Sequence, residues 1–295
     1  MYIFAKLGKY EFIFTRFLGS GLGNILFPWA RSVLAAKKYS LQSIEPTWLN
    51  IRIGSIIRKE TDLRLYSDLF VNTNNNVSGI KKFISLFFLK KIPENELSHS
   101  DILKKGVVIF TGMQGFFQPI MHDYSFINNQ LIQMTSQKHL MGLSFDFSNS
   151  ISLHIRLGDF KVGKQTTPLA WFVDVVNLVR KYSRPNLKVY IFSDGSDVEL
   201  APLLQLNNSQ RLSFCSSIAD LLALSRSNIF VGSKGSTFSM WASYLGRMPV
   251  IWPIGGLTQR LYTDNYFKEI ESDGLSLPEA FILELTDNPP DILPH

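Results

Sequence analysis

The chain has 295 residues, of which 45% are hydrophobic and 18% are charged, so it can bury substantial cores and is neither disordered nor fibrous. Its length suggests two domains. A single cysteine, Cys215, excludes a disulfide framework and fits a reducing compartment.

The positive charge is concentrated in the first half of the chain. The net charge is +6; residues 1–145 carry 17 Lys+Arg and 9 Asp+Glu, and residues 146–295 carry 13 and 15. A basic half is typical of a protein that meets a membrane surface, nucleic acid or an acidic glycan, and equally of a solvated surface with excess lysine. Among the anionic partners we expect no nucleic acid. For the apolar segment between lysine pairs at 81–91, two interpretations stay open: peripheral contact with an anionic membrane, and a buried helix with solvated lysines.

The apolar segments are too short to cross a membrane. Runs such as 83–89 fall far short of the about 20 residues that a membrane helix needs. The N-terminus also lacks a convincing signal-peptide core. These features predict a cytoplasmic protein, peripheral at the inner face of the membrane, or a protein from which an anchor has been removed.

In chain order, residues 11–17 are expected to form a buried strand, followed by a glycine turn at 19–23 and a helix over 25–39. Strand, glycine turn and helix in this order are typical of the start of a Rossmann-type domain. The pattern is weaker over residues 40–105. There, an apolar stretch at 83–89 lies between the lysine pairs at 81–82 and 90–91. Residues 107–111 then predict a strand.

The second half alternates strands and helices more regularly. Strands are expected at 152–155, 188–192, 212–214, 228–231 and 249–252, and helices at 168–180, 217–225 and 236–245. This alternation predicts an α/β fold with a parallel sheet and right-handed crossovers. Ligands of such sheets bind beyond the carboxyl ends of the strands, so 154–159, 193–195 and 232–237 should line one crevice. We place the domains at 1–145 and 146–295.

The sequence favours a site that handles negative charge without a metal. It contains no Asp-x-Asp, His-x-His or His-Glu-x-x-His motif, and its five histidines are scattered. Arg156 follows a predicted strand, and a guanidinium can fork onto two phosphate oxygens. Gly158 would let the backbone turn closely, and Asp159 would orient Arg156 or cap the loop. A purely local ion pair between Arg156 and Asp159 is the competing interpretation.

The helix expected at 236–245 offers a second place for an anion. Ser236 and Thr237 open this helix at the crevice end, where first-turn N–H groups and hydroxyls suit a negative charge. Ordinary N-capping by Ser236 explains the same residues and is compatible with either interpretation.

A dinucleotide-binding interpretation fits part of the first half. Gly19, Gly21 and Gly23 alternate along the predicted turn, and Glu45 lies where a ribose-binding acid would be expected. However, the pattern is G-x-G-x-G rather than G-x-G-x-x-G, and no group for hydride transfer follows.

Several short motifs occur in a fixed order along the chain. They are GLGNILF (Gly21–Phe27), GFFQ (Gly115–Gln118), HIRLGD (His154–Asp159), FSD (Phe192–Asp194), DL (Asp220–Leu221) and STFSMW (Ser236–Trp241). In order and spacing they resemble the GLGNQLFQ, GYFQ, HIRRGD, FSDD, DL and SSFSWW motifs of the α-1,2-fucosyltransferases, glycosyltransferase family 11, within the GDP-fucose-dependent superfamily. The resemblance covers most of the chain.

The resemblance implies a GT-B fold, with two Rossmann-like domains facing across a cleft. It also implies an inverting, metal-independent enzyme without a cofactor, which transfers L-fucose from GDP-fucose to a glycan hydroxyl. The expected acceptor position is galactose O2, in α-1,2 linkage, on an oligosaccharide or a lipid-linked saccharide.

Residue roles follow from the same resemblance. Arg156 would bind the β-phosphate as the departing diphosphate gains charge, and Asp159 would join it in the catalytic set. His154 and Asp220 would contact guanosine, and Asp194 would lie near the donor. The diphosphate and fucose would be held by Ser236, Thr237 and Phe238. The cleft would be faced from the first domain by Gly21, Gly23, Asn24 and Gln118.

Three positions depart from the family pattern. Leu157 replaces the second arginine of HIRRGD and so removes a cation, Gly235 replaces an asparagine, and Met240 replaces a tryptophan. Two alternatives stay open: a transferase for another nucleotide sugar, and a catalytically degenerate glycan-binding relative. The general base is open between Asp159, Asp194 and the departing phosphate itself.

Overall fold

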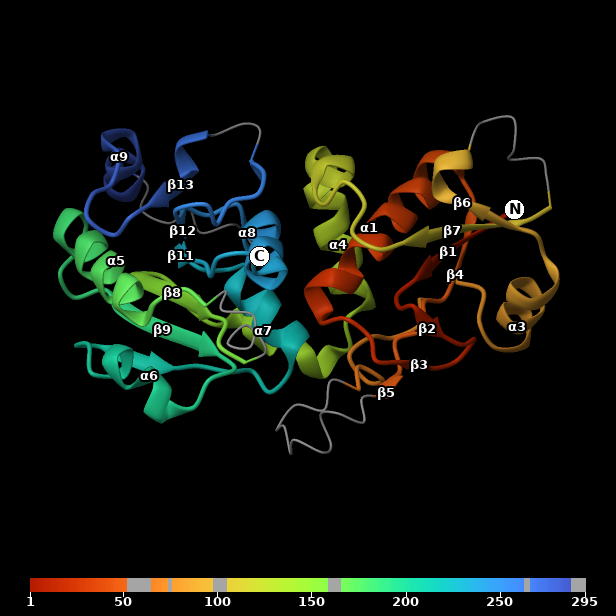
Figure 1. The fold of residues 1–295 in the computed structure, drawn as a ribbon, viewed down its shortest axis with the longest axis horizontal. Helices are drawn as coiled ribbons and strands as arrows, with labels where there is room; N and C mark the ends of the chain where they lie inside the picture. Colours follow the sequence, from red (N-terminus) through yellow and green to blue (C-terminus); the bar gives the residue numbers. More distant parts are fainter. Residues whose placement is uncertain (52–64, 74–75, 98–104, 159–165, 263–265, 288–295) are drawn as a thin grey trace. The chain divides into compact units, whose positions relative to one another are not determined.

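The computed structural model describes residues 1–51, 65–73, 76–97, 105–158, 166–262 and 266–287. The chain divides into two compact units, the first spanning Met1–Lys138 and the second beginning at His139 (Figure 1). The structure therefore places the boundary between residues 138 and 139, a few residues before the predicted boundary between 145 and 146. Asp159, which the resemblance places in the catalytic set, falls outside the described residues.

A parallel sheet forms the centre of the first unit. Its strand order is β4-β1-β7-β6, with every neighbouring pair parallel. The strands are β4 (Gln42–Ile44), β1 (Tyr2–Lys6), β7 (Val107–Thr111) and β6 (Lys91–Pro93). The described helices are α1 (Leu22–Tyr39), α3 (Gly79–Phe88) and α4 (Tyr124–Met134), with short turns η1 (Glu94–Glu96), η3 (Gln118–Asp123) and η4 (Gln137–His139). A small separate sheet joins β2 (Tyr10–Glu11), β3 (Arg16–Phe17) and β5 (Asn50–Ile51).

The prediction of a buried strand over residues 11–17 is wrong. The strand inside the sheet is β1, whose residues 3–5 are all buried. Consecutive burial is the mark of a parallel strand covered on both faces. By contrast, Phe12 and Phe14 are 63% and 57% exposed, in the turn between the short strands β2 and β3. The strand predicted over 107–111 is confirmed as β7.

The predicted helix over 25–39 is confirmed as α1, which begins earlier, at Leu22. It does not directly follow a strand of the main parallel sheet, because β1 ends at Lys6, and β2 and β3 of the small separate sheet lie between β1 and α1. A dinucleotide fingerprint requires the glycine turn to link the strand straight to the helix. The first unit therefore lacks the local structure on which the dinucleotide-binding interpretation depends.

The second unit is built on a wider parallel sheet. Its strands, in spatial order, are β10 (Ser209–Arg211), β9 (Lys188–Ser193), β8 (Ser150–Ile155), β11 (Ile229–Val231), β12 (Val250–Pro253) and β13 (Glu269–Ser272). All its neighbouring pairs are parallel. The described helices and turns are α5 (Leu169–Tyr182), α6 (Asp197–Leu204), α7 (Ser217–Leu224), α8 (Thr237–Gly246), α9 (Glu279–Asp287), η5 (Met141–Ser144) and η7 (Tyr266–Lys268).

Most predicted elements of the second half are confirmed, but the strand expected at 212–214 is wrong. Strand β10 ends at Arg211. Leu212 still donates its N–H to Ile191 O at 2.9 Å. The N–H of Phe214 instead donates to the Asp220 carboxylate at 2.5 Å, so the chain leaves the sheet here. The Phe214 N–H thus donates to a side chain instead of to a carbonyl group of the neighbouring strand.

The strands of the second sheet follow the order 3-2-1-4-5-6 when numbered along the chain. The first of them, β8, lies in the middle, and the path reverses direction between β8 and β11. Side chains alternate along β8: Ile151, Leu153 and Ile155 pack into the core cluster that also contains the inner face of α5. His154 points to the opposite face, where α8 supplies its hydrogen-bond partner.

Candidate active site

The most distinctive location in the second unit is the carboxyl end of the neighbouring strands β8 and β11. In open α/β sheets, ligands bind in the crevice where the strand order reverses, outside the carboxyl ends. His154 and Arg156 lie at the end of β8, and residues 232–236 link β11 to α8. The structure thus brings together two segments that the sequence separates by about 80 residues.

Ser233 joins these two strand ends. Its hydroxyl donates to His154 O at 2.8 Å and accepts the Arg156 N–H at 2.9 Å. The residue is 1% exposed, so both bonds are shielded from water. Ser233 therefore fixes the backbone from which the Arg156 side chain projects. The sequence analysis missed it, because a serine after a strand carries no distinguishing signal.

His154 is a buried, uncharged member of the site. Its Nδ1 hydrogen-bonds the Ser239 hydroxyl at 2.6 Å, and its ring stacks on Phe238 with 4.8 Å between centroids. Burial lowers the pKa of His154 to about 4; the Asp194 carboxylate opposes this shift and the Arg156 guanidinium adds to it. The imidazole is neutral at pH 7, so it provides a hydrogen-bonding, stacked surface rather than a cation.

Arg156 is held by an ion pair. Its Nη1 binds Oδ2 of Asp194, which follows the neighbouring strand β9. The Arg156 side chain keeps 20% exposure and can still meet a ligand. The local Arg156–Asp159 pair considered from the sequence is not needed to orient this guanidinium, because Asp194 does so.

Asp194 also organises the loop after β8. Its Oδ1 accepts the N–H groups of Leu157 at 2.8 Å and Gly158 at 3.2 Å. Burial raises the pKa of Asp194, but the Arg156 charge and these two N–H groups outweigh it, so the net pKa is lowered. A Cβ on Gly158 would lie 2.5 Å from Oδ2 of Asp194, which explains the need for glycine. An anionic carboxylate with these partners positions Arg156 and is a poor proton acceptor.

The start of α8 faces the same strand ends. Ser236 is its N-cap and accepts the Ser239 N–H at 3.3 Å, as the capping interpretation required. Thr237 is the first helical residue, and Phe238 in the same turn covers His154. The positive end of the helix dipole is therefore aimed at the crevice. Lys234 adds a cation to this loop; its Nζ donates to Ile254 O at 3.1 Å.

The departures from the family pattern have structural explanations. Leu157 is 5% exposed and belongs to the core cluster, packed against Gly195, so its side chain does not face the crevice. The Leu157 side chain therefore packs in the core of the second unit. Gly235 has φ +65°, which glycine and asparagine adopt most readily. Met240 lies on the buried side of α8 and is 2% exposed.

Asp220 holds the chain that follows β10. It lies in the first turn of α7, where its carboxylate accepts the Phe214 N–H at 2.5 Å and the Ser213 hydroxyl at 3.2 Å. Asp220 therefore shapes the loop between β10 and α7.

The motifs of the first unit are brought together by aromatic packing. Phe27, in the GLGNILF motif, meets Phe117 of the GFFQ motif with 4.8 Å between ring centroids. Gly21 is the N-cap of α1, and its carbonyl accepts the Asn24 N–H at 3.1 Å. Gly23 and Asn24 are thus in the first helical turn rather than in a loop. Gln118 opens η3 and is exposed.

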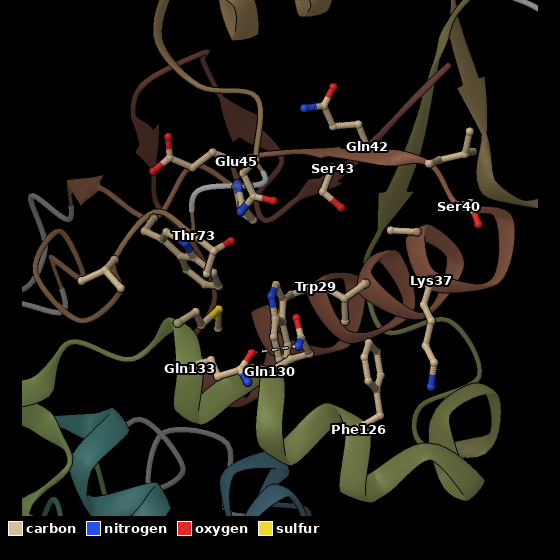
Figure 2. A pocket seen from close by; sticks show the side chains of 18 residues that line it. Trp29, Lys37, Ser40, Gln42, Ser43, Glu45, Thr73, Phe126, Gln130 and Gln133 are labelled. Atoms are coloured by element: carbon tan, nitrogen blue, oxygen red, sulfur yellow. Dashed lines mark hydrogen bonds between the residues drawn. The ribbon is translucent and has the colours of Figure 1, made fainter.

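The first unit also contains a pocket of about 640 Å³, lined by α1, α4 and the chain around β4. Figure 2 shows aromatic rings beside amide, hydroxyl and carboxylate groups. Labelled examples are Trp29, Ser43, Glu45, Thr73 and Phe126. Gln130 Nε2 donates to Gln133 Oε1 at 3.1 Å at the rim. Such a lining suits a polyhydroxylated ligand, because each polar type can exchange hydrogen bonds with hydroxyl groups.

No described helix is both long enough and apolar enough to pass through a bilayer. Among the described residues, no group of three or more His, Cys, Asp and Glu side chains could hold a metal ion.

Comparison with known proteins identifies the fold. No protein-family model matches the sequence, and no curated protein matches it. Solved structures do. The NodZ α-1,6-fucosyltransferase soaked with GDP-fucose aligns with a TM-score of 0.55 and 11% identity, over 85% of this chain and 94% of that chain. The fucosyltransferase NodZ from Bradyrhizobium aligns with a TM-score of 0.54 and 11% identity, over 84% and 94%.

A third structure, a mutant of FUT1 from Arabidopsis thaliana in complex with GDP, aligns with a TM-score of 0.50 and 11% identity, over 84% of this chain and 69% of that chain. At these identities the comparisons establish the fold: a mixed α/β architecture with parallel sheets, shared with GT-B fucosyltransferases. The predicted fold class is confirmed.

Proposed function

We propose that this protein is an inverting glycosyltransferase that transfers L-fucose from GDP-fucose to a hydroxyl group of a glycan. The observation that carries the proposal is the Arg156 guanidinium, oriented by Asp194 where the strand order of a Rossmann-type sheet reverses. The shared fold supports it, because the similar structures are fucosyltransferases described with GDP or GDP-fucose. The motif series supports the choice of fucose.

In the proposed reaction, the acceptor hydroxyl attacks the anomeric carbon of fucose and GDP departs. Negative charge then grows on the β-phosphate. Arg156 neutralises that charge with a forked contact, and Thr237 and Ser236 present the positive end of α8 to it. Because fixed cations and a helix end serve this role, and the sequence has no Asp-x-Asp motif, we propose a metal-independent reaction without a cofactor.

The remaining roles are assigned by position. His154, neutral and stacked on Phe238, would contact guanosine, and Phe238 would also border fucose. Asp220 would contact guanosine from the first turn of α7, where it also holds the loop after β10. Of the two carboxylates considered as general base, Asp194 is committed to Arg156, which favours Asp159 or the departing phosphate.

For the acceptor, we propose galactose O2, in α-1,2 linkage, on an oligosaccharide or a lipid-linked saccharide. The resemblance to family 11 motifs supports this choice. The pocket of the first unit supplies a lining suited to a saccharide (Figure 2). If it holds the acceptor, Thr73→Ala should raise the KM for a galactoside acceptor and leave hydrolysis of GDP-fucose unchanged. An unchanged acceptor KM would remove the pocket from the proposal.

Donor binding and turnover test the function directly. GDP-fucose should raise the Tm more than GDP-mannose or a UDP-sugar at equal concentration, because only a ligand of the folded state stabilises it. The protein should also hydrolyse GDP-fucose slowly without an acceptor, and excess EDTA should change this rate by less than about twofold. Binding without turnover would indicate a degenerate relative. A larger shift with another nucleotide sugar would change the donor.

A further inference from the structure

Helix α3 presents an apolar face to the surface of the first unit. This face, called the α3 face below, consists of Ile80, Phe83, Ile84, Phe87 and Phe88, which are 78%, 40%, 49%, 63% and 70% exposed. At about 100° per residue, these positions share an arc of roughly 140° on the helix. Lys81 borders that arc and is exposed. Figure 1 shows α3 at one margin of the unit.

The distribution of side chains on α3 is the reverse of that on an ordinary surface helix, because a lysine lies on its buried side and apolar residues lie on its exposed side. Lys82 is 3% exposed; its Nζ donates to Thr47 Oγ1 at 3.1 Å and lies 5.7 Å from the Phe4 ring centroid. Burial lowers the pKa of Lys82, against the opposing charges of Glu45 and Glu11. Of the four lysines that flank this segment, three are therefore at the surface. Phenylalanines face outward although the unit buries a lysine beneath them.

The unit has further exposed apolar side chains outside the helix. The Lys82 Nζ also lies 5.9 Å from the Phe14 ring centroid, which places the exposed turn between β2 and β3 beside α3. Phe12 and Phe14 in this turn are exposed apolar side chains of the same unit. Contiguous exposed apolar patches of this kind mark interaction surfaces in soluble domains.

The surrounding charge indicates which kind of partner the surface fits. Lys81, Lys90 and Lys91 are exposed at the border and at the end of α3. Residues 1–138 carry 17 Lys+Arg against 9 Asp+Glu. Aromatic side chains framed by lysines match the boundary between acyl chains and anionic headgroups. From these observations we propose that the α3 face docks on an anionic lipid surface. The proposal goes beyond the transferase assignment and does not depend on it.

Co-sedimentation with vesicles tests the proposal. The wild-type protein should pellet with phosphatidylcholine vesicles that contain phosphatidylglycerol, and not with phosphatidylcholine alone. Phe87→Ser combined with Phe88→Ser should lower the bound fraction at least about tenfold, because both rings leave the interface. Lys90→Gln with Lys91→Gln should weaken binding and reduce its dependence on salt. The matched control is Val198→Ser with Leu275→Ser, which removes side chains that are 87% and 78% exposed in the second unit; binding should not change.

Three results would overturn the proposal. The first is equal failure of the wild-type protein to bind either vesicle. The second is unchanged binding by the Phe87→Ser/Phe88→Ser variant. The third is self-association of the wild-type protein without vesicle binding. If sedimentation velocity shows this association and the Phe87→Ser/Phe88→Ser variant loses it, the α3 face binds a second copy of the chain. The variants should keep the wild-type Tm and rate of GDP-fucose hydrolysis, so loss of binding reports on the surface itself.

Discussion

Asp194 holds the guanidinium of Arg156 across the ends of the neighbouring strands β9 and β8. The same carboxylate accepts the N–H groups of Leu157 and Gly158, so one side chain fixes both the charge and the loop that carries it. The guanidinium is therefore oriented before a ligand arrives. A preorganised cation is most effective where charge develops during the reaction.

Removing the cation should affect turnover more than any other single change in the site. Arg156→Ala should remove about 3–5 kcal/mol of transition-state stabilisation, which lowers kcat/KM for GDP-fucose roughly a hundredfold to several-thousandfold. Arg156→Lys should recover little, because an ammonium cannot fork onto two oxygens. Ser236→Ala should remove only about 1 kcal/mol of transition-state stabilisation, because it deletes one hydroxyl group that also caps α8. Circular dichroism checks that each variant is folded. If folded Arg156→Ala keeps more than about a tenth of the activity, Arg156 is not the phosphate contact.

The ion pair predicts that Asp194 and Arg156 act as a unit. Asp194→Asn keeps the size of the side chain but places an amide against the guanidinium, and should lower kcat/KM by roughly tenfold to a hundredfold. In the double variant with Arg156→Ala, the loss should be close to that of Arg156→Ala alone, because nothing remains to be oriented. The measurement is a double-mutant cycle in kcat/KM. Additive losses would mean that Asp194 contributes independently of Arg156.

The sequence predicted the individual parts of this site more readily than their relationships. Arg156 follows a strand and Ser236 caps a helix, and both signals are local. The partnership of Asp194 with Arg156 depends on β9 lying beside β8, which single-sequence patterns do not specify. Ser233 depends in the same way on β11 lying beside β8.

The burial of Leu157 was predictable from the alternation of side chains along β8. Alternation along β8 buries residues 151, 153 and 155, and Leu157 continues the same series into the core. Comparison with an arginine in the family motif directed attention to a missing charge instead. The sequence also showed that α3 is apolar between lysines, but not which face is covered. The structure buries Lys82 and exposes Phe87, the reverse of what hydrophobicity alone predicts.

The backbone at Gly235 predicts which substitutions the loop accepts. Gly235 has φ +65°, and a Cβ there would meet nothing within 4 Å, so only the backbone conformation opposes a side chain. Gly235→Asn should therefore stay close to wild type in stability, whereas Gly235→Ala should cost about 1 kcal/mol and Gly235→Val more. Thermal and urea denaturation measure the series. Equal stability of the asparagine and valine variants would contradict the conformational argument.

A buried carboxyl group in the second unit predicts a change of stability with pH. Glu269 is 0% exposed, and its Oε2 accepts the Leu261 N–H at 2.8 Å. Burial raises its pKa from 4.5 to about 7, against the hydrogen bond from Leu261 and the charge of Arg260. The folded state thus favours the protonated group. Its stabilising contribution is complete below pH 4.5 and is lost as the pH rises through 7.

Glu269→Gln should remove this dependence, because glutamine resembles the protonated acid at every pH. Relative to wild type, the variant should gain roughly 3 kcal/mol of unfolding free energy between pH 5 and pH 8. His154, with its pKa lowered to about 4, acts in the opposite sense as the pH falls below 6.5, but it does so in both proteins and cancels in the difference. Urea denaturation at the two pH values measures the effect. The matched control, exposed Glu96→Gln, should give the same difference from wild type at both. If the difference in unfolding free energy between Glu269→Gln and wild type is also the same at both pH values, this carboxyl group is not protonated in the folded protein near neutral pH.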